Sequence, residues 1–237
     1  MSSHLTRFTR TTPGLEKTLR LIQSLCVLAL QIPDLDSVAV LRVGIAKQQL
    51  ALTRRFLRFF NFIDCFHRGF ALLGTPSTPS PTSPSDTWGE LLRIVLEITK
   101  WGCFGWYFLL EDLTLLHATS ISPLPDTWNQ TLLTEANKFW FYALGVSMLE
   151  SGWAFISLVF SAQKNDPEKE GKTHETKMTR GRVSSSSLFK KVLVDACDLL
   201  IPGTFLGWIA MEQGGVGVGV GMVVSTLLSG WEIWKAV

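Results

Sequence analysis

Charged residues are scarce in this chain of 237 residues: they make up 18% of it, below the roughly 25% that is usual in soluble globular domains. There are 22 Lys and Arg against 20 Asp and Glu, so no excess of positive charge suggests binding to nucleic acid. Hydrophobic residues reach 46%, which excludes a disordered chain. Nine tryptophans, only two tyrosines and a mean hydropathy of +0.24 indicate a protein that exposes part of its surface to lipid.

Patterns of catalytic and metal-binding residues are also lacking. The four cysteines lie far apart without a CxxC pair, and the four histidines are isolated. The chain has no HExxH motif, no phosphate-binding loop and no nucleophile elbow. Glu111 and Asp112 are adjacent carboxylates, which we interpret as a helix boundary rather than as an acid and base pair. We therefore expect no enzyme activity, no cofactor and no metal site.

The charges that are present alternate in sign along the chain. Residues 1–70 carry 10 Lys and Arg against 4 Asp and Glu, and residues 163–191 carry 8 against 4. Residues 71–162 carry 3 against 8, and residues 192–237 carry 1 against 4. This alternation is typical of membrane proteins, in which Lys and Arg concentrate in cytosolic segments and the inserted segments are apolar.

Apolar residues recur at helical spacing, and signals for β-hairpins are nearly absent, so we predict an all-α, membrane-associated protein. Shifts in composition divide the chain into five regions. These are an N-terminal amphipathic helical region (1–73), a Pro/Ser/Thr-rich linker (74–87), an apolar helical region with possible membrane insertion (88–162), a charged disordered loop (163–191) and a C-terminal glycine-rich transmembrane region (192–237).

A first helix is predicted to start at Thr12 and Pro13 and to end before Pro33. On a helical wheel it is amphipathic, with Leu15, Leu19, Ile22, Leu25, Cys26 and Ala29 on one face and Glu16, Lys17, Arg20 and Ser24 on the other. By itself, this pattern also suits a core helix of a soluble bundle.

The stretch Lys47–Phe70 is predicted to form one helix with an aromatic face and a basic face. The apolar face consists of Leu52, Phe56, Phe59, Phe60, Ile63, Phe66 and Phe70, and the opposite face carries Lys47, Arg54, Arg58, Asn61 and Arg68. Large aromatic side chains opposite basic ones are typical of a helix that lies in the membrane interface and is attracted to anionic lipid. A core helix, or a nucleic-acid or calmodulin-like contact, is the alternative interpretation.

Three later segments are candidates for membrane insertion. Residues 91–116 are apolar, but their charges leave no uncharged run long enough to span a bilayer alone. Residues 139–160 contain one acid, Glu150, and could span if that side chain is paired or protonated. Residues 199–234 are the strongest candidate, since their central part carries no charge. We expect at least one true span there.

Small residues recur four apart at the start of the charge-free part of this last segment. Such spacing lets helices approach closely in lipid, and it favours helix packing or self-association. A flexible glycine-rich span is the alternative, and a dinucleotide-binding loop is excluded because its third glycine position falls on Val220 or Met222. The residues concerned are Gly215, Gly217, Gly219 and Gly221.

Three segments, in this order, resemble the peroxin-eleven family of peroxisomal membrane proteins. They are TPGLEKTLRLIQ at Thr12–Gln23, ALTRRFLRFFNF at Ala51–Phe62, and the glycine-rich C-terminal segment that ends with GWEIW at Gly230–Trp234. The resemblance implies an α-helical protein of the peroxisomal membrane that elongates the organelle before division by inserting an amphipathic helix. It further implies cooperation with the fission machinery, of the dynamin-related kind. The headgroup-binding residues would be Lys47, Arg54, Arg55, Arg58 and Arg68.

We therefore predict a factor that promotes peroxisome elongation, fission and proliferation by membrane remodelling. Its expected partners are membrane lipids, preferably anionic, further copies of itself and the fission machinery, and not nucleic acid. One alternative is a channel for small solutes, which the acids Glu97, Glu150 and Glu212 in apolar segments would favour. A second alternative is an adaptor that recruits fission factors.

Overall fold

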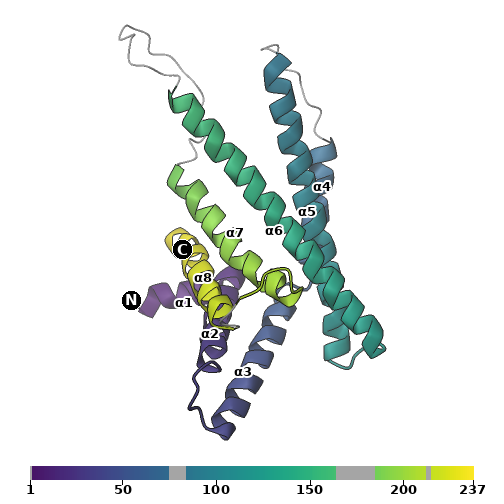
Figure 1. The fold of residues 1–237 in the computed structure, drawn as a ribbon, viewed down its shortest axis with the longest axis vertical. Helices are drawn as coiled ribbons and strands as arrows, with labels where there is room; N and C mark the ends of the chain where they lie inside the picture. Colours follow the sequence, from purple (N-terminus) through teal and green to yellow (C-terminus); the bar gives the residue numbers. More distant parts are fainter. Residues whose placement is uncertain (1, 75–83, 164–184, 212–214) are drawn as a thin grey trace.

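The computed structural model describes residues 2–74, 84–163, 185–211 and 215–237, and in these ranges it contains eight helices and no strand (Figure 1). The all-α prediction is therefore confirmed. Most of both predicted linkers, and Glu212, lie outside the described residues. The helices are α1 (Ser2–Arg10), α2 (Thr12–Ala29), α3 (Ser37–Phe56), α4 (Asn61–Gly74), α5 (Pro84–Ala118), α6 (Asp126–Gln163), α7 (Ser185–Phe205) and α8 (Gly215–Ala236).

Local signals explain how α2 begins. The side chain of Thr11 accepts a hydrogen bond from the backbone N–H of Gly14 at 3.1 Å, and Pro13 occupies the first turn. Gly14 also permits the sharp corner between α1 and α2, because an added Cβ there would lie 2.1 Å from the carbonyl oxygen of Phe8. The chain turns after Ala29, ahead of Pro33.

The structure corrects the single helix predicted for residues 47–70. The chain turns at residues 57–60, where Arg58 N–H donates to Arg55 O at 3.0 Å and Phe59 N–H donates to Phe56 O at 3.3 Å. These bonds join residues three apart, which is a tighter turn than the α-helix has. No Pro or Gly marks the break in the sequence. The interruption instead accompanies packing on α5, where an added Cβ at Gly105 would lie 2.6 Å from the ring of Phe66.

The apolar segment 199–234 is likewise divided between two helices. At the end of α7 the N–H of Trp208 donates to Gly203 O at 2.9 Å, and the N–H of Gly207 donates to Thr204 O at 3.2 Å. Gly207 has a φ of +71°, so this ending is a Schellman motif, which requires a residue in the left-handed region. The motif separates α7 from α8 inside a segment whose hydropathy alone suggests one element.

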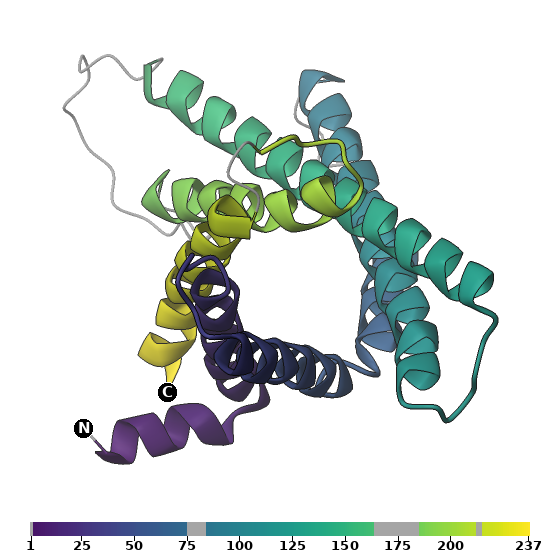
Figure 2. The same ribbon diagram turned by 60° about the horizontal axis from the view of Figure 1, so that its bottom comes forward.

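The helices are arranged as a ring rather than as a compact stack. Figure 2 shows α2, α3, α5, α6, α7 and α8 around a common centre, with α1 outside it near the C-terminus. Consecutive helices from α5 to α8 contact each other, α8 contacts α2, and α2 contacts α3. A sparser contact between α3 and α5 closes the ring, and α4 packs along α5.

The interior of the ring is polar, and its exterior is largely apolar. On α2, Arg20 and Ser24 are buried while Ile22 and Leu25 are 45% and 52% exposed. In the described part of the chain, buried polar side chains outnumber buried apolar ones, and large hydrophobic side chains are exposed on every helix. A soluble bundle would bury the apolar face of α2, so this arrangement favours lipid as the environment.

Ion pairs and hydrogen bonds between helices accommodate the buried polar groups. Glu150 of α6 pairs with Lys100 of α5, and Arg20 of α2 pairs with Asp198 of α7. Such pairing is what ionisable residues in apolar segments require. The pair with Lys100 neutralises Glu150, which is the single acid in the segment 139–160 that was predicted to insert.

Helix α8 is the one helix in the described ranges that is long and apolar enough to cross a membrane. Its 22 residues rise about 33 Å at 1.5 Å per residue, close to the hydrocarbon thickness of a bilayer. The C-terminal transmembrane segment predicted from hydropathy therefore corresponds to α8, while α7 precedes it as a separate helix.

Candidate functional site

The candidate site is built from residues 47–74, which comprise the second half of α3, the turn and α4. Its outward side is a hydrophobic surface that we call the aromatic face. Four of the predicted membrane-inserting residues belong to it, and Leu73, one turn beyond the predicted stretch, adds to it. The exposed fractions are 51% for Phe56, 66% for Phe60, 52% for Ile63, 68% for Phe70 and 66% for Leu73.

The other three predicted membrane-inserting residues, Leu52, Phe59 and Phe66, are only half exposed or less. Phe59 packs edge-on against Phe60, with ring centroids 5.0 Å apart. Phe66 turns towards α5, where its ring lies 5.9 Å from that of Trp106. Phe66 thus anchors α4 to α5, whereas Phe56, Phe60, Ile63 and Phe70 remain exposed.

The basic residues of the stretch are divided between the surface and the interior. Arg68 is exposed, with its guanidinium 4.7 Å from the ring of Trp101, and Lys47 is half-buried. Arg54, in contrast, is buried and pairs with Glu16 of α2 at 2.7 Å. Arg55 and Arg58 reach Glu111 of α5 at 3.4 Å and 3.3 Å. Three of the five predicted headgroup-binding residues therefore point into the ring.

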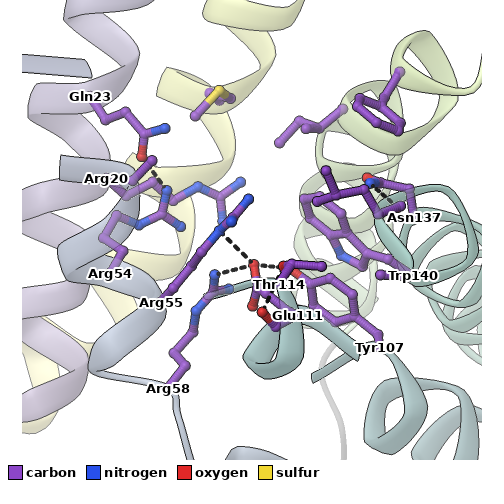
Figure 3. Close-up of a pocket in the computed structure, with 16 residues that line it drawn as sticks. Arg20, Gln23, Arg54, Arg55, Arg58, Tyr107, Glu111, Thr114, Asn137 and Trp140 are labelled. Atoms are coloured by element: carbon purple, nitrogen blue, oxygen red, sulfur yellow. Dashed lines mark hydrogen bonds and ion pairs between the residues drawn. The ribbon is translucent and has the colours of Figure 1, made fainter. Parts of the chain in front are cut away.

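These arginines line a cavity of about 260 Å³ at the centre of the ring, which we call the arginine cavity (Figure 3). Figure 3 shows the arginines on one side, with ion pairs from Arg55 and Arg58 to Glu111, and Asn137 and Trp140 across from them. The polar lining residues are Arg20, Gln23, Arg54, Arg55, Arg58, Tyr107, Glu111, Thr114 and Asn137. The site thus joins an external hydrophobic surface to an internal cluster of positive charge.

The pairing of Arg54 with Glu16 governs the charge state of the carboxyl group. Burial by itself would raise the pKa of Glu16, but the charge of Arg54, aided by Lys17 and Arg58, outweighs burial and leaves the pKa below its ordinary value. A carboxylate with a lowered pKa stabilises the fold above its unfolded-state pKa, and that contribution is lost as the pH falls through the folded-state pKa. At neutral pH the pair is therefore fully charged.

The four glycines singled out in α8 lie against α2, α7, the loop between α2 and α3, or the segment before α8. An added Cβ at Gly219 would be 2.7 Å from Leu28 of α2, and one at Gly221 would be 3.3 Å from the backbone oxygen of Cys197 on α7. Gly215 lies similarly close to Gln31, and Gly217 to Met211. Small residues at these positions allow close approach within one chain. Self-association through them stays a prediction.

Replacing Gly221 with leucine is expected to separate α8 from α7 and to lower the stability by about 1–3 kcal/mol, the usual cost of overpacking. The backbone oxygen of Cys197 cannot move aside as a flexible side chain would. The measurement is the melting temperature of the purified protein in detergent. Val220→Leu is the control, because Val220 is 48% exposed on the same helix. Equal melting temperatures for both variants would contradict the packing role.

A match to a protein family identifies the group of proteins to which this chain belongs. The chain matches the family model described as Peroxisomal biogenesis factor 11 (PEX11) over residues 2–234 of its 237. The chain belongs to the PEX11 family. No curated protein and no solved structure gives a match. The resemblance drawn from the three sequence segments is thereby confirmed, and the family is one of the peroxisomal membrane with a role in peroxisome biogenesis.

Sequence reasoning missed two residues that organise the site of this PEX11-family protein. Glu111, interpreted above as part of a helix boundary, lies well inside α5, and it accepts a hydrogen bond from Tyr107 at 3.0 Å besides pairing with two arginines. Asp198 binds Arg20 from α7. The available signal was an acid within an apolar segment, because such a residue must find a partner. The identity of the partner is a matter of tertiary structure.

Proposed function

We propose that this PEX11-family protein elongates the peroxisomal membrane and promotes its division by inserting the aromatic face into one leaflet. The observation that carries the proposal is the exposure of Phe56, Phe60, Ile63 and Phe70, which lie within one short stretch of the chain. Large exposed apolar side chains are costly in water and suit the boundary between headgroups and acyl chains.

The mechanism is a wedge. Side chains that enter one leaflet to a depth of about 5–10 Å expand its area relative to the other leaflet and favour positive curvature. With half to two-thirds of each of the five side chains exposed, transfer to the membrane supplies on the order of 5 kcal/mol. Helix α8 as a span would hold the protein in the bilayer while the wedge acts. Insertion is therefore local, and its effect on curvature grows with the number of copies.

The basic residues contribute in two ways under this proposal. Arg68 and Lys47 attract the headgroups of anionic lipids near the aromatic face, each with about 1 kcal/mol at the membrane surface. Arg54, Arg55 and Arg58 would reach headgroups only after their ion pairs with Glu16 and Glu111 open. Their role in headgroup binding thus requires movement of α3 away from α2, which carries Glu16, and from α5, which carries Glu111.

Association with partners is the second part of the proposal. A wedge bends a membrane effectively only at high local density, so we propose that copies of the protein associate in the membrane. Glycines four apart on α8 are candidates for that contact where they are not already covered by α2 and α7. Elongated membrane would then be divided by dynamin-related fission machinery recruited to it.

A small-solute channel is the second candidate function. The buried pair of Lys100 and Glu150, which Lys191 approaches at 3.8 Å, places charge between apolar helices and favours this alternative. Glu150 is paired with Lys100 and Lys191 within the chain, however, so the cluster has a sufficient structural role as a link between α5, α6 and α7.

Reconstitution of the full-length protein into anionic liposomes tests both functions in one preparation. We expect tubules by negative-stain electron microscopy at high ratios of protein to lipid, and no unitary conductance in planar bilayers made from the same liposomes. Spherical vesicles at every ratio would contradict remodelling. Conductance steps that disappear in a Glu150→Gln variant would favour the channel.

A further inference from the structure

The arginine cavity holds more positive charge than its own walls neutralise. Arg54 is compensated by Glu16 and Arg20 by Asp198, both of which lie outside the lining. The remaining two arginines, Arg55 and Arg58, share Glu111, the one carboxylate that lines the cavity. On this count the lining arginines carry one positive charge more than these carboxylates neutralise, and such a charge attracts an anion more strongly inside a cavity than on the open surface.

The two arginines hold Glu111 loosely. Both pair with the same carboxylate oxygen, Oε1, at 3.4 Å and 3.3 Å, and this oxygen also accepts the hydrogen bond from Tyr107. Charge-assisted hydrogen bonds between a guanidinium and an oxyanion are ordinarily about 2.7–2.9 Å long. The guanidinium groups of Arg55 and Arg58 therefore have hydrogen-bonding capacity that Glu111 does not satisfy.

A phosphate group has the chemistry that these donors require. Its oxygens accept paired hydrogen bonds from planar guanidinium groups, which makes arginine a preferred residue for phosphate recognition. A volume of about 260 Å³ is several times the roughly 30 Å³ occupied by a water molecule, so a phosphate with a small substituent fits. Ile201, Phe205 and Met222 line the cavity as well and provide an apolar wall for that substituent.

We propose that the arginine cavity is a binding site for a phosphate monoester, carried either by a lipid headgroup or by a soluble organic phosphate. The phosphate lies between Arg55 and Arg58 and replaces Glu111 as their main acceptor. The site is internal and uses a different surface from the aromatic face, so the proposal goes beyond membrane insertion and stands independently of it.

The test uses the full-length protein in a neutral detergent, with its melting temperature measured at constant ionic strength. Glycerol 3-phosphate is the soluble probe, dioctanoyl phosphatidic acid is the lipid probe, and sodium chloride and dioctanoyl phosphatidylcholine are their respective controls. We expect a saturable rise in melting temperature with at least one phosphate probe, because a ligand that binds the folded state stabilises it. The probe that acts at the lower concentration identifies the source of the phosphate. No rise with either probe would overturn the proposal.

Three variants assign the effect to the cavity. Arg55→Gln is expected to weaken binding of the phosphate probe by about tenfold or more, since it removes a charge-assisted hydrogen bond. Arg42→Gln removes the same charge from the exposed side of α3 and is expected to change the dissociation constant less than twofold. Equal weakening by these two variants would indicate general surface charge and overturn the proposal.

Glu111→Gln is expected to strengthen phosphate binding, so its result cannot be explained by a loss of the fold. It keeps the shape of the side chain but removes the competing charge, so we expect severalfold tighter binding of the phosphate probe. A folded Glu111→Gln protein with unchanged or weaker binding would overturn the proposal even if Arg55→Gln cannot be purified.

Discussion

Replacing Phe60 and Phe70 together with glutamate is expected to abolish tubulation of anionic liposomes by the full-length protein. The two rings are 66% and 68% exposed, so the substitutions leave the interior of the ring of helices unchanged. Each aromatic side chain contributes about 1.5–3 kcal/mol when fully buried in an apolar environment, and the new carboxylates add repulsion from anionic lipid. Binding of the aromatic face should therefore weaken by at least about 100-fold.

The measurement is the fraction of tubular liposomes at a fixed ratio of protein to lipid, with melting temperature recorded for each variant. Ile121→Glu is the matched control, because Ile121 is 67% exposed but lies in the loop between α5 and α6. Expression in cells provides a second readout, in which the wild-type protein elongates peroxisomes and the double variant does not. Undiminished tubulation by the double variant would contradict the wedge.

The second large effect is expected from Arg20→Met. Arg20 is 6% exposed, pairs with Asp198 of α7 and also donates to the hydroxyl of Ser225 on α8 at 3.1 Å. Its removal leaves a carboxylate that is only 14% exposed without its partner, and breaking a largely buried pair typically costs about 3–5 kcal/mol. We expect a correspondingly large fall in the free energy of unfolding, measured by chemical denaturation in detergent.

Two further variants separate this effect from a general loss of charge. Arg20→Met combined with Asp198→Leu should recover much of the stability, because both charges are then replaced by apolar groups. Lys190→Met breaks the pair with Glu232, which also joins α7 to α8 but is solvent-exposed, and it should cost less than about 1 kcal/mol. Equal costs for Arg20→Met and Lys190→Met would show that burial of the pair is unimportant.

How far the site could be predicted is clearest at residues 47–70. Helical spacing grouped seven apolar residues, of which Phe56, Phe60, Ile63 and Phe70 are at least half exposed in the structure. It could not reveal the turn at 57–60, which has no Pro or Gly to mark it and which accompanies packing of Phe66 near Gly105 of α5. Nor could it distinguish an arginine that meets solvent from one that meets Glu111.

The fold shows where some of the few charged side chains of this chain are placed. Composition indicated an apolar surface, and the exposed side chains of Ile22 and Leu25 on α2 agree with that indication. Several of the charges are directed inwards, where Arg20, Arg54, Lys100 and Glu111 are all buried. The alternation of charge along the chain gave no indication of this, because it does not show whether a charged side chain faces the interior or the surface.

The sequence by itself determined the helical class, the family and the apolar C-terminal helix, because each follows from local periodicity, composition or motif order. Only the tertiary structure decided which acid each arginine meets, that α2 turns its polar face inwards, and that six helices enclose a basic cavity. The physical reason is that an ion pair in a low-dielectric interior depends on partners such as Arg20 and Asp198, which lie 178 positions apart. No local pattern specifies a contact over that separation.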